Sequence, residues 1–388
     1  MSDRTGGIDR RNLVATAFGL SAAGLVGTEF APAHAVAAAG TTVRTGDVVQ
    51  GKPVVSALQL GDLEPGQKHA LLFQGVQMPT GEPWYVSVLA VRGSRPGKRV
   101  VLVAGVHGDE ISPIRTIQAV VEQLDPAAMT GDVLAVLDVS RPALAAMARR
   151  WPNSGRGIDL VDINREWPGN ANAPTASARH AALLFDRLLR PNADYAIDFH
   201  TATTGMDMTA LHLARMDLPE VRAMAELFPI DHIFDNAGYP GLLANAFIDA
   251  GIPAFTPEIG APRVLDRAMI PLFVEGTMNV LRLHAIVDGP LGRTGRDSGV
   301  FVGDRATPIV ASRGGYVELL VGLKERVAAG QTLAVQRDAF GEEVARYFSP
   351  VDAEVAARRT DATAEPGNLL LMLLHVGTPA TAGGAYPE

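Results

Sequence analysis

The chain has 388 residues, of which 47% are hydrophobic and 20% are charged. This composition is too apolar for a disordered protein and predicts a sizeable buried core, and the length favours about two domains. The formal net charge of -8 gives no global basic field for phosphate backbones, so no nucleic-acid partner is expected. Cysteine is absent, which excludes disulfides, thiolate zinc sites, iron–sulfur clusters and a cysteine nucleophile.

The first 35 residues have the pattern of an export signal. Arg10-Arg11 precedes a mildly apolar run from Leu13 to Val26, and Ala33-His34-Ala35 then offers a small-x-small cleavage site. The paired arginines favour the twin-arginine route. Because the apolar run is too short to span a hydrocarbon core of about 30 Å, no stable membrane anchor is expected. Residues 1–35 are therefore expected to be a twin-arginine-type signal peptide, and the protein to be periplasmic or extracellular.

An α/β domain is expected in the middle of the chain, where apolar runs alternate with helix-like stretches. Strand patterns occupy residues 99–106, 132–139, 195–200 and 252–255, and helical patterns occupy residues 111–124, 176–189 and 218–228. Such alternation implies crossover connections and a mostly parallel or mixed sheet flanked by helices.

The domain limits follow from changes in composition. The α/β domain is expected over residues 98–290, after a β-rich N-terminal lead-in over residues 36–97. Past Asp288-Gly289-Pro290, short β-like pieces are broken by glycines, which predicts a small all-β module over residues 291–388.

Polar residues follow three of the predicted strands. The first strand runs into His107-Gly108-Asp109-Glu110, the pattern of residues 195–199 leads to His200, and the pattern of residues 252–255 leads to Glu258. In open α/β sheets, ligands bind outside the carboxyl ends of the strands. These side chains are therefore expected to face one crevice.

Two imidazoles and one carboxylate make a catalytic zinc site with an open fourth position, and a second carboxylate can then act as base. Bound zinc lowers the pKa of its water to about 7, which gives a nucleophile without cysteine or serine. The chain has no G-x-S-x-G elbow, Walker loop or G-x-G-x-x-G run that would compete for this role. Taken alone, an H-x-x-E pair or a single histidine is a weak pattern; their coincidence at strand ends favours a metal.

A polar cluster, Asp162-Ile163-Asn164-Arg165-Glu166-Trp167-Pro168-Gly169, lies between these segments. Its simplest interpretation is a surface turn, because Pro-Gly closes loops and Asn and Asp favour them. A functional interpretation is that the guanidinium of Arg165 and the amide of Asn164 bind a substrate carboxylate.

The motifs H-G-D-E, D-I-N-R-E-W-P-G, D-F-H-T and T-P-E-I-G, in this order, resemble the succinylglutamate desuccinylase/aspartoacylase branch of the zinc carboxypeptidase superfamily. The resemblance is strong over roughly residues 98–285, and the C-terminal module also resembles that family's β-rich appendix. The 93-residue interval between the two histidines resembles the acylase branch more than the longer digestive carboxypeptidases. It implies one Zn²⁺ per chain with ligands His107, Glu110 and His200, a carboxylate clamp of Asn164 and Arg165, and Glu258 as general base.

The resemblance also implies an arginine that polarises the scissile carbonyl shortly before the D-x-N-R motif. Arg156 is the best candidate for this catalytic role, and Arg150 is the alternative because the spacing departs from the family pattern by about a residue. An orienting role behind the metal is implied for Asp162. Two further residues have open interpretations: Tyr239 as a proton donor or a plain turn residue, and Arg263 as a contact to a second substrate carboxylate. Six other histidines, among them His212, are expected at the surface or in the core with satisfied hydrogen bonds.

The expected function is a zinc-dependent amidohydrolase that cleaves the amide bond of an N-acyl amino acid with metal-activated water. The first alternative is an exported zinc carboxypeptidase acting on peptides or cell-wall fragments, and the second is a non-catalytic zinc or peptide binder. The expected partner is a small molecule or peptide with a free carboxylate, and a homo-oligomer is compatible with the sequence.

Overall fold

The computed structural model describes residues 41–153 and 159–377. The expected signal peptide and Arg156 lie outside these residues. Within the described ranges, no helix combines the length and the apolar character needed to cross a lipid bilayer.

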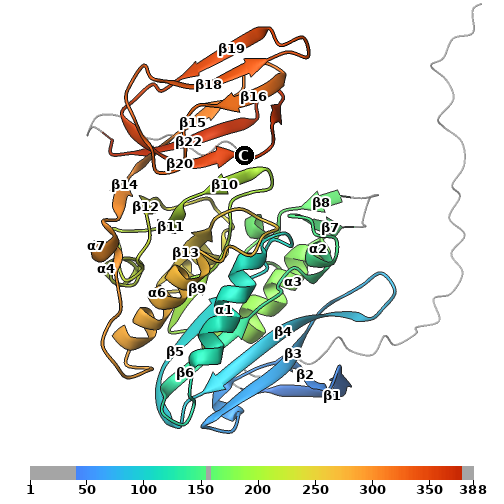
Figure 1. The fold of residues 1–388 in the computed structure, drawn as a ribbon. Helices are drawn as coiled ribbons and strands as arrows, with labels where there is room; N and C mark the ends of the chain where they lie inside the picture. Colours follow the sequence, from blue (N-terminus) through green and yellow to red (C-terminus); the bar gives the residue numbers. More distant parts are fainter. Residues whose placement is uncertain (1–40, 154–158, 378–388) are drawn as a thin grey trace, which may run out of the picture. The chain divides into compact units, whose positions relative to one another are not determined.

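An eleven-stranded mixed sheet forms the centre of the α/β part (Figure 1). The neighbouring strands β6, β5, β9 and β13 run parallel to one another, and β11 is antiparallel to β13. This confirms the expected mixed α/β class. In spatial order the strands are β1 (Val43–Val49), β2 (Lys52–Ala57), β3 (Gln67–Gln77), β4 (Pro83–Arg92), β6 (Thr130–Val136), β5 (Arg95–Val103), β9 (Tyr195–Asp198), β13 (Ala254–Ile259), β11 (Ala210–Ala214), β12 (His232–Asp235) and β14 (Phe301–Gly303).

Helices cover both faces of this sheet because its central strands are apolar on both sides. In β5, Leu102 belongs to one buried cluster while Val101 and Val103 belong to the other, as the two-residue period of a strand requires. The first cluster contains side chains of α1 (Ile111–Gln123), α4 (Pro219–Ala225) and α6 (Ile270–Leu283), and the second contains side chains of α3 (Ala176–Leu184) and α5 (Leu243–Asp249).

Local signals explain several helix limits. In α1, the buried residues Pro113, Ile117 and Val121 recur every four residues, which gives the helix one core-facing stripe. Thr175 caps α3 by accepting a hydrogen bond from the Ala178 backbone N–H. The shorter elements are α2 (Arg141–Ala145), α7 (Gly295–Ser298), the hairpin β7 (Trp151–Asn153) with β8 (Asp159–Val161), a π-helical turn (Phe185–Leu189) and three 3-10 turns (Leu60–Asp62, Ile163–Arg165 and Arg190–Asn192).

Two antiparallel sheets form the C-terminal part and enclose a core of their own. One sheet contains β10 (Met206–Met208), β20 (Ala353–Arg359), β22 (Leu369–His375), β15 (Arg305–Val310) and β17 (Arg326–Val327). The other contains β19 (Glu343–Phe348), β18 (Thr332–Arg337), β16 (Gly315–Leu319) and β21 (Thr363–Ala364).

Strands are exchanged between the two parts of the chain. β10 comes from the middle of the α/β segment but pairs with β20 of the C-terminal sheet. In the other direction, β14 lies beyond residue 290 but pairs with β12 and extends the large sheet. The C-terminal sheet is therefore continuous with a strand that lies six residues after His200 in the chain.

Candidate metal and substrate site

The histidine and glutamate side chains of the site come from the ends of neighbouring strands. His107 follows β5, Glu110 stands immediately before α1, and His200 follows β9. Gly108 makes the intervening turn possible, since a Cβ at this position would lie 2.0 Å from the backbone carbonyl carbon of Ala143.

His107, Glu110 and His200 are buried, and one ligand atom of each lies within 4.8 Å of the others. Glu110 Oε1 is 2.8 Å from His107 Nδ1, and Glu110 Oε2 is 2.9 Å from His200 Nδ1. The two Nδ1 atoms themselves are 3.1 Å apart. Two imidazole nitrogens and a carboxylate converging on one point make a donor set that can hold a divalent metal ion.

The other nitrogen of each imidazole contacts a carboxylate. His107 Nε2 lies 3.0 Å from Asp162 Oδ1, and His200 Nε2 lies 3.0 Å from Asp198 Oδ2. A histidine that donates Nε2–H to a carboxylate keeps the Nδ1 lone pair for a metal, so these contacts select the tautomer that a metal site needs. The arrangement matches the orienting role expected for Asp162.

Asp198 was not predicted as a site residue, although a signal for it exists. It precedes His200 by two residues at the end of β9, and side chains two residues apart on a strand point to the same side. The pattern D-x-H at a strand end therefore indicates that the aspartate can contact the histidine.

The charges of the cluster shift its pKa values. Burial opposes ionisation of Glu110, but the positive charge on His107 and His200 outweighs burial and lowers the pKa of this carboxyl. The pKa of Asp162 is likewise held well below its usual range, because His107 and Arg149 outweigh burial. Burial lowers the pKa of His200, but Asp198 and Glu110 outweigh it and raise this pKa well above the ordinary value.

Among the described residues, Arg149 forms an ion pair with Glu110 of the cluster. Its Nη1 lies 2.8 Å from Glu110 Oε1, and its Nη2 lies 4.0 Å from Asp162 Oδ2. Arg150, the alternative considered from the sequence, is exposed and lines the pocket. Nothing in the spacing of two adjacent arginines indicates which one turns inward, so Arg149 was missed.

Asn164 and Arg165 lie in the 3-10 turn after Asp162 and both line the pocket. The amide of Asn164 contacts protein groups: Oδ1 accepts a hydrogen bond from Leu243 N, and Nδ2 lies 3.4 Å from His200 Nε2. Arg165 is 39% exposed, and its guanidinium lies 5.0 Å from the centroid of the Tyr239 ring. Of the two, Arg165 presents the more accessible donors for a carboxylate.

Glu258 lies within β13, which extends to Ile259 rather than ending before the glutamate. Its backbone is beside that of His200, because His200 N donates to Pro257 O and Ile259 N donates to His200 O, each over 2.8 Å. The Oε2 atom is buried and has no hydrogen-bond partner in the described part of the chain. Burial, assisted by the charge of Glu110, raises the pKa of Glu258 to about 8.

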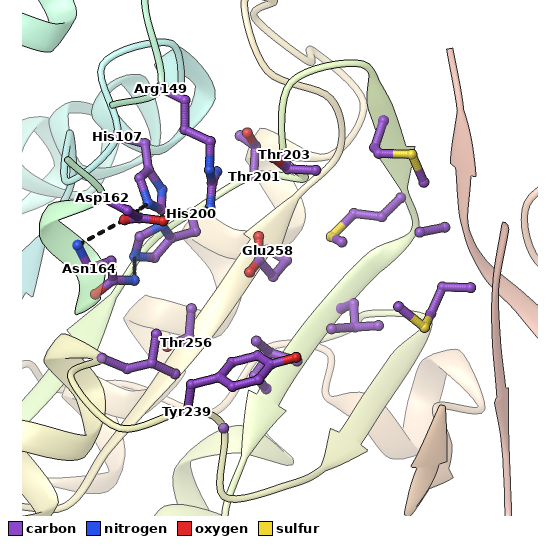
Figure 2. A pocket seen from close by; sticks show the side chains of 18 of the residues that line it. His107, Arg149, Asp162, Asn164, His200, Thr201, Thr203, Tyr239, Thr256 and Glu258 are labelled. Carbon is purple, nitrogen blue, oxygen red and sulfur yellow. Dashed lines mark hydrogen bonds and ion pairs between the residues drawn. The ribbon is translucent and has the colours of Figure 1, made fainter. Parts of the chain in front are cut away.

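A pocket of about 390 Å³ connects these groups. Figure 2 shows Glu258 between the two histidines and a second group of side chains that includes sulfur atoms. Tyr239 also lines the pocket. Arg263 does not: it is 54% exposed, its N–H donates to Asp109 O over 2.7 Å, and its Nη2 donates to Met147 O.

His212 is a buried histidine outside the cluster, and the expectation of satisfied hydrogen bonds is wrong for it. Both ring nitrogens lack a hydrogen-bond partner among the described residues. The ring packs edge-on against Phe228, Phe255 and Phe273, with centroids 4.5, 4.9 and 5.8 Å away. This apolar enclosure lowers the pKa of His212 to about 3, so the ring is neutral at pH 7.

Comparisons with known proteins agree on one family. The profile of the succinylglutamate desuccinylase/aspartoacylase catalytic domain matches residues 96–284. The chain is 25% identical over 291 residues to the N-alpha-acetyl-L-2,4-diaminobutyric acid deacetylase of Halomonas elongata, a match that covers 72% of this chain and 83% of that protein.

Two solved structures share the fold. The succinylglutamate desuccinylase/aspartoacylase of Rhodobacter sphaeroides has a TM-score of 0.70 at 22% identity, with 83% of this chain and 100% of that chain covered. The product-bound ectoine utilization protein EutE (DoeB) of Ruegeria pomeroyi has a TM-score of 0.72 at 19% identity, with 86% of this chain and 98% of that chain covered.

The matched domain spans all the strand ends that carry His107, Glu110, His200 and Glu258, so the motifs and the fold point to the same relatives. The catalytic domain over residues 96–284 belongs to the succinylglutamate desuccinylase/aspartoacylase family.

Proposed function

We propose that this protein is a zinc-dependent amidohydrolase that cleaves the amide bond of an N-acyl amino acid. The observation that carries the proposal is the double orientation of the histidines: each turns Nδ1 toward Glu110 and Nε2 toward a second carboxylate. This arrangement suits a metal site with one unprotonated nitrogen from each ring.

The donor set also favours zinc as the metal. Two nitrogens and a carboxylate oxygen, with no thiolate in the chain, suit zinc at a catalytic site that keeps a position open for water. Zinc held by His107, Glu110 and His200 would supply a Lewis acid and lower the pKa of water.

Glu258 is proposed as the general base. Glu258 lines the pocket together with His107 and His200, its Oε2 has no hydrogen-bond partner among the described residues, and its raised pKa makes it a stronger base than an ordinary carboxylate once it is ionised. It would take a proton from the attacking water and pass it to the departing amine. Retention of such a base disfavours the non-catalytic binder, which needs ligands but no proton acceptor.

Two arginines are proposed to act on the substrate. Arg149, next to Glu110, would donate to the scissile carbonyl oxygen as negative charge develops on it. Arg165, accessible beside Tyr239, would bind the carboxylate of the amino acid, and Asn164, whose Oδ1 accepts from Leu243 N, would hold the turn in position.

The test combines metal content with substrate choice. Elemental analysis of the purified protein is expected to find close to one zinc per chain, and exhaustive chelation should abolish hydrolysis that added zinc restores. The protein is then incubated with N-acyl amino acids beside short peptides and cell-wall fragments. Release of a carboxylic acid from the acyl substrates alone supports the proposal. Cleavage of peptides alone would instead support the carboxypeptidase, and activity that survives chelation would exclude the zinc mechanism.

We also propose that the protein acts outside the cytoplasm, on the basis of the Arg10-Arg11 pattern and the apolar run after it. Twin-arginine export carries folded proteins, which is compatible with a metal loaded before export.

A further inference from the structure

We propose that the half of the pocket away from the metal ligands selects an apolar, uncharged substituent of the substrate. This inference rests on the proposed amide hydrolysis and names the class of substrate. The pocket wall there comes from β10 and β11 of the middle segment and from β20 and β22 of the C-terminal sheet. Its larger side chains are Met206, Met208, Leu211, Leu213, Leu369 and Met372.

The register of the strands places this wall directly beside Glu258. On the antiparallel pair β11 and β13, Leu211 stands opposite Glu258 and Leu213 stands opposite Thr256. Side chains opposite one another on neighbouring strands are in contact range on the same face. A substituent attached close to the scissile amide therefore meets leucine side chains first.

The wall continues into the C-terminal sheet as a row across three strands. Met208 of β10 stands opposite Ala357 of β20, and Ala357 stands opposite Met372 of β22. These residues belong to one apolar cluster that joins the two parts of the chain. Alanine in the middle of the row leaves space between the two methionines, whose flexible side chains adapt to different apolar shapes.

The charges of the pocket are confined to the other half. Its ionisable lining residues are His107, Arg149, Arg150, Asp162, Arg165, His200, Tyr239 and Glu258, whereas the four wall strands contribute no ionisable side chain to the lining. Charged residues on these strands have partners outside the pocket lining: Asp207 Oδ2 lies 3.8 Å from Arg358 Nη2, and Glu354 Oε2 lies 2.9 Å from His232 Nε2. Arg359, which stands opposite Met206, donates to Thr363 O and lies 3.3 Å from Asp361 Oδ2.

An ionised substituent against this wall would lose water without gaining a partner, which costs more than an apolar group does. Aspartyl or succinyl carboxylates, and the side-chain amine of diaminobutyrate, fit it poorly for this reason. The apolar substituent can be the acyl chain or the side chain of the amino acid. The wall would recognise either group by the same apolar contacts. Two series of compounds, one varying the acyl chain and one varying the side chain, show which group binds there.

The first test measures binding without turnover. The zinc-loaded Glu258→Gln variant is titrated by calorimetry with N-acyl glycines from acetyl to hexanoyl and, separately, with N-acetyl amino acids of increasing unbranched side-chain length. The affinity in one series should rise about fourfold per methylene, the fold-change that corresponds to about 0.8 kcal/mol. N-succinyl glycine, N-acetyl aspartate and N-acetyl diaminobutyrate should bind more weakly than their apolar isosteres. The proposal would be overturned if the compound with a charged acyl chain or side chain bound most tightly. It would also be overturned if affinity did not depend on chain length in either series.

The second test alters the wall. Met208→Lys should reduce the increase in affinity per methylene at least twofold. It should also improve the affinity for N-succinyl glycine relative to that for its apolar isostere. Leu291→Lys is the matched control, because Leu291 is 49% exposed and lies outside the pocket lining. Thermal unfolding of each variant checks that the change is local.

The outcomes separate the two proposals. If the binding order holds but the wild-type protein hydrolyses none of the compounds, amide hydrolysis is wrong and apolar recognition stands. If the wild type hydrolyses charged acyl amino acids in preference, amide hydrolysis stands and the apolar assignment is wrong.

Discussion

Asp198 Oδ2 lies 3.0 Å from His200 Nε2, on the side of the imidazole away from Glu110. Both residues are buried, Asp198 as the last residue of β9 and His200 two residues after it. A buried carboxylate and imidazole in contact fix each other's protonation and orientation. Asp198 would therefore act on a bound metal through His200 rather than as a ligand.

Asp198→Asn should weaken zinc binding about 10- to 100-fold, the usual effect of losing a carboxylate behind a histidine ligand. His200→Ala and His107→Ala should abolish stoichiometric binding, since each removes one of three ligands. Competition with a chromophoric chelator gives the affinities. Asp194→Asn is the control: its ion pair with Arg99 is partly exposed and lies just before the same strand. Unchanged affinity in Asp198→Asn would show that the contact does not support the metal.

Glu258→Gln should keep the metal and reduce kcat by about two to four orders of magnitude, because the amide cannot accept the proton that the carboxylate takes. The variant and the wild type are compared by zinc content and by initial rates on the same substrate. Glu275→Gln, which alters an ion pair with exposed Arg293, should leave both unchanged. Full activity in zinc-loaded Glu258→Gln protein would assign the base elsewhere.

Arg165→Lys should raise KM for N-acyl amino acids at least tenfold and change kcat little, because the fork that binds a carboxylate acts in the ground state and the transition state alike. For a substrate whose carboxylate is replaced by a carboxamide, Arg165→Lys should not raise KM. Arg346→Lys, in an exposed ion pair of the C-terminal part, serves as the control. A fall in kcat at constant KM would instead place Arg165 at the reacting carbonyl.

The stability of the metal-free protein should depend on pH through His212. Its pKa is about 3 in the folded chain and about 6.5 when unfolded, so below pH 6.5 the unfolded chain binds a proton that the folded chain does not. The contribution of His212 to the free energy of unfolding therefore decreases as pH falls, and at pH 5 it is lower by about 2 kcal/mol than well above pH 6.5.

In His212→Phe that part of the pH dependence should disappear, whatever the packing of the new ring does at pH 7. Urea unfolding of the metal-free wild type and the metal-free variant between pH 5 and pH 7 measures how the free energy of unfolding changes with pH in each. His180 is also buried, with its pKa lowered to about 4. Because it is present in both proteins, its contribution to the pH dependence cancels in the comparison. Equal slopes would mean that water or a partner reaches the His212 ring.

Replacing Arg10 and Arg11 with lysines should retain the protein in the cytoplasm of a bacterial host that has the twin-arginine pathway. Cell fractionation followed by immunodetection locates the product. Arg4→Lys, in the same segment but outside the pair, should be exported normally. Export of the double-lysine variant at the normal rate would exclude this route.

The sequence by itself determined the class of the fold and the segments that carry the site. Apolar runs of strand length alternate with helical stretches, and this alternation predicted a mostly parallel or mixed sheet flanked by helices. That β5, β9 and β13 are neighbours in the sheet is seen only in the structure. The sequence also placed His107, Glu110, His200 and Glu258 near the ends of those strands, because such junctions are visible as a change from apolar to polar residues.

The tertiary structure alone decided which of these residues touch and what surrounds them. The strand period defines the face on which a side chain lies but not its neighbour across the sheet. Arg149 at Glu110, the phenylalanines around His212 and the exchange of β10 into the C-terminal sheet all join segments far apart in the chain. Such contacts depend on the packing of the whole core, to which every strand and helix contributes, and no local pattern of residues encodes them.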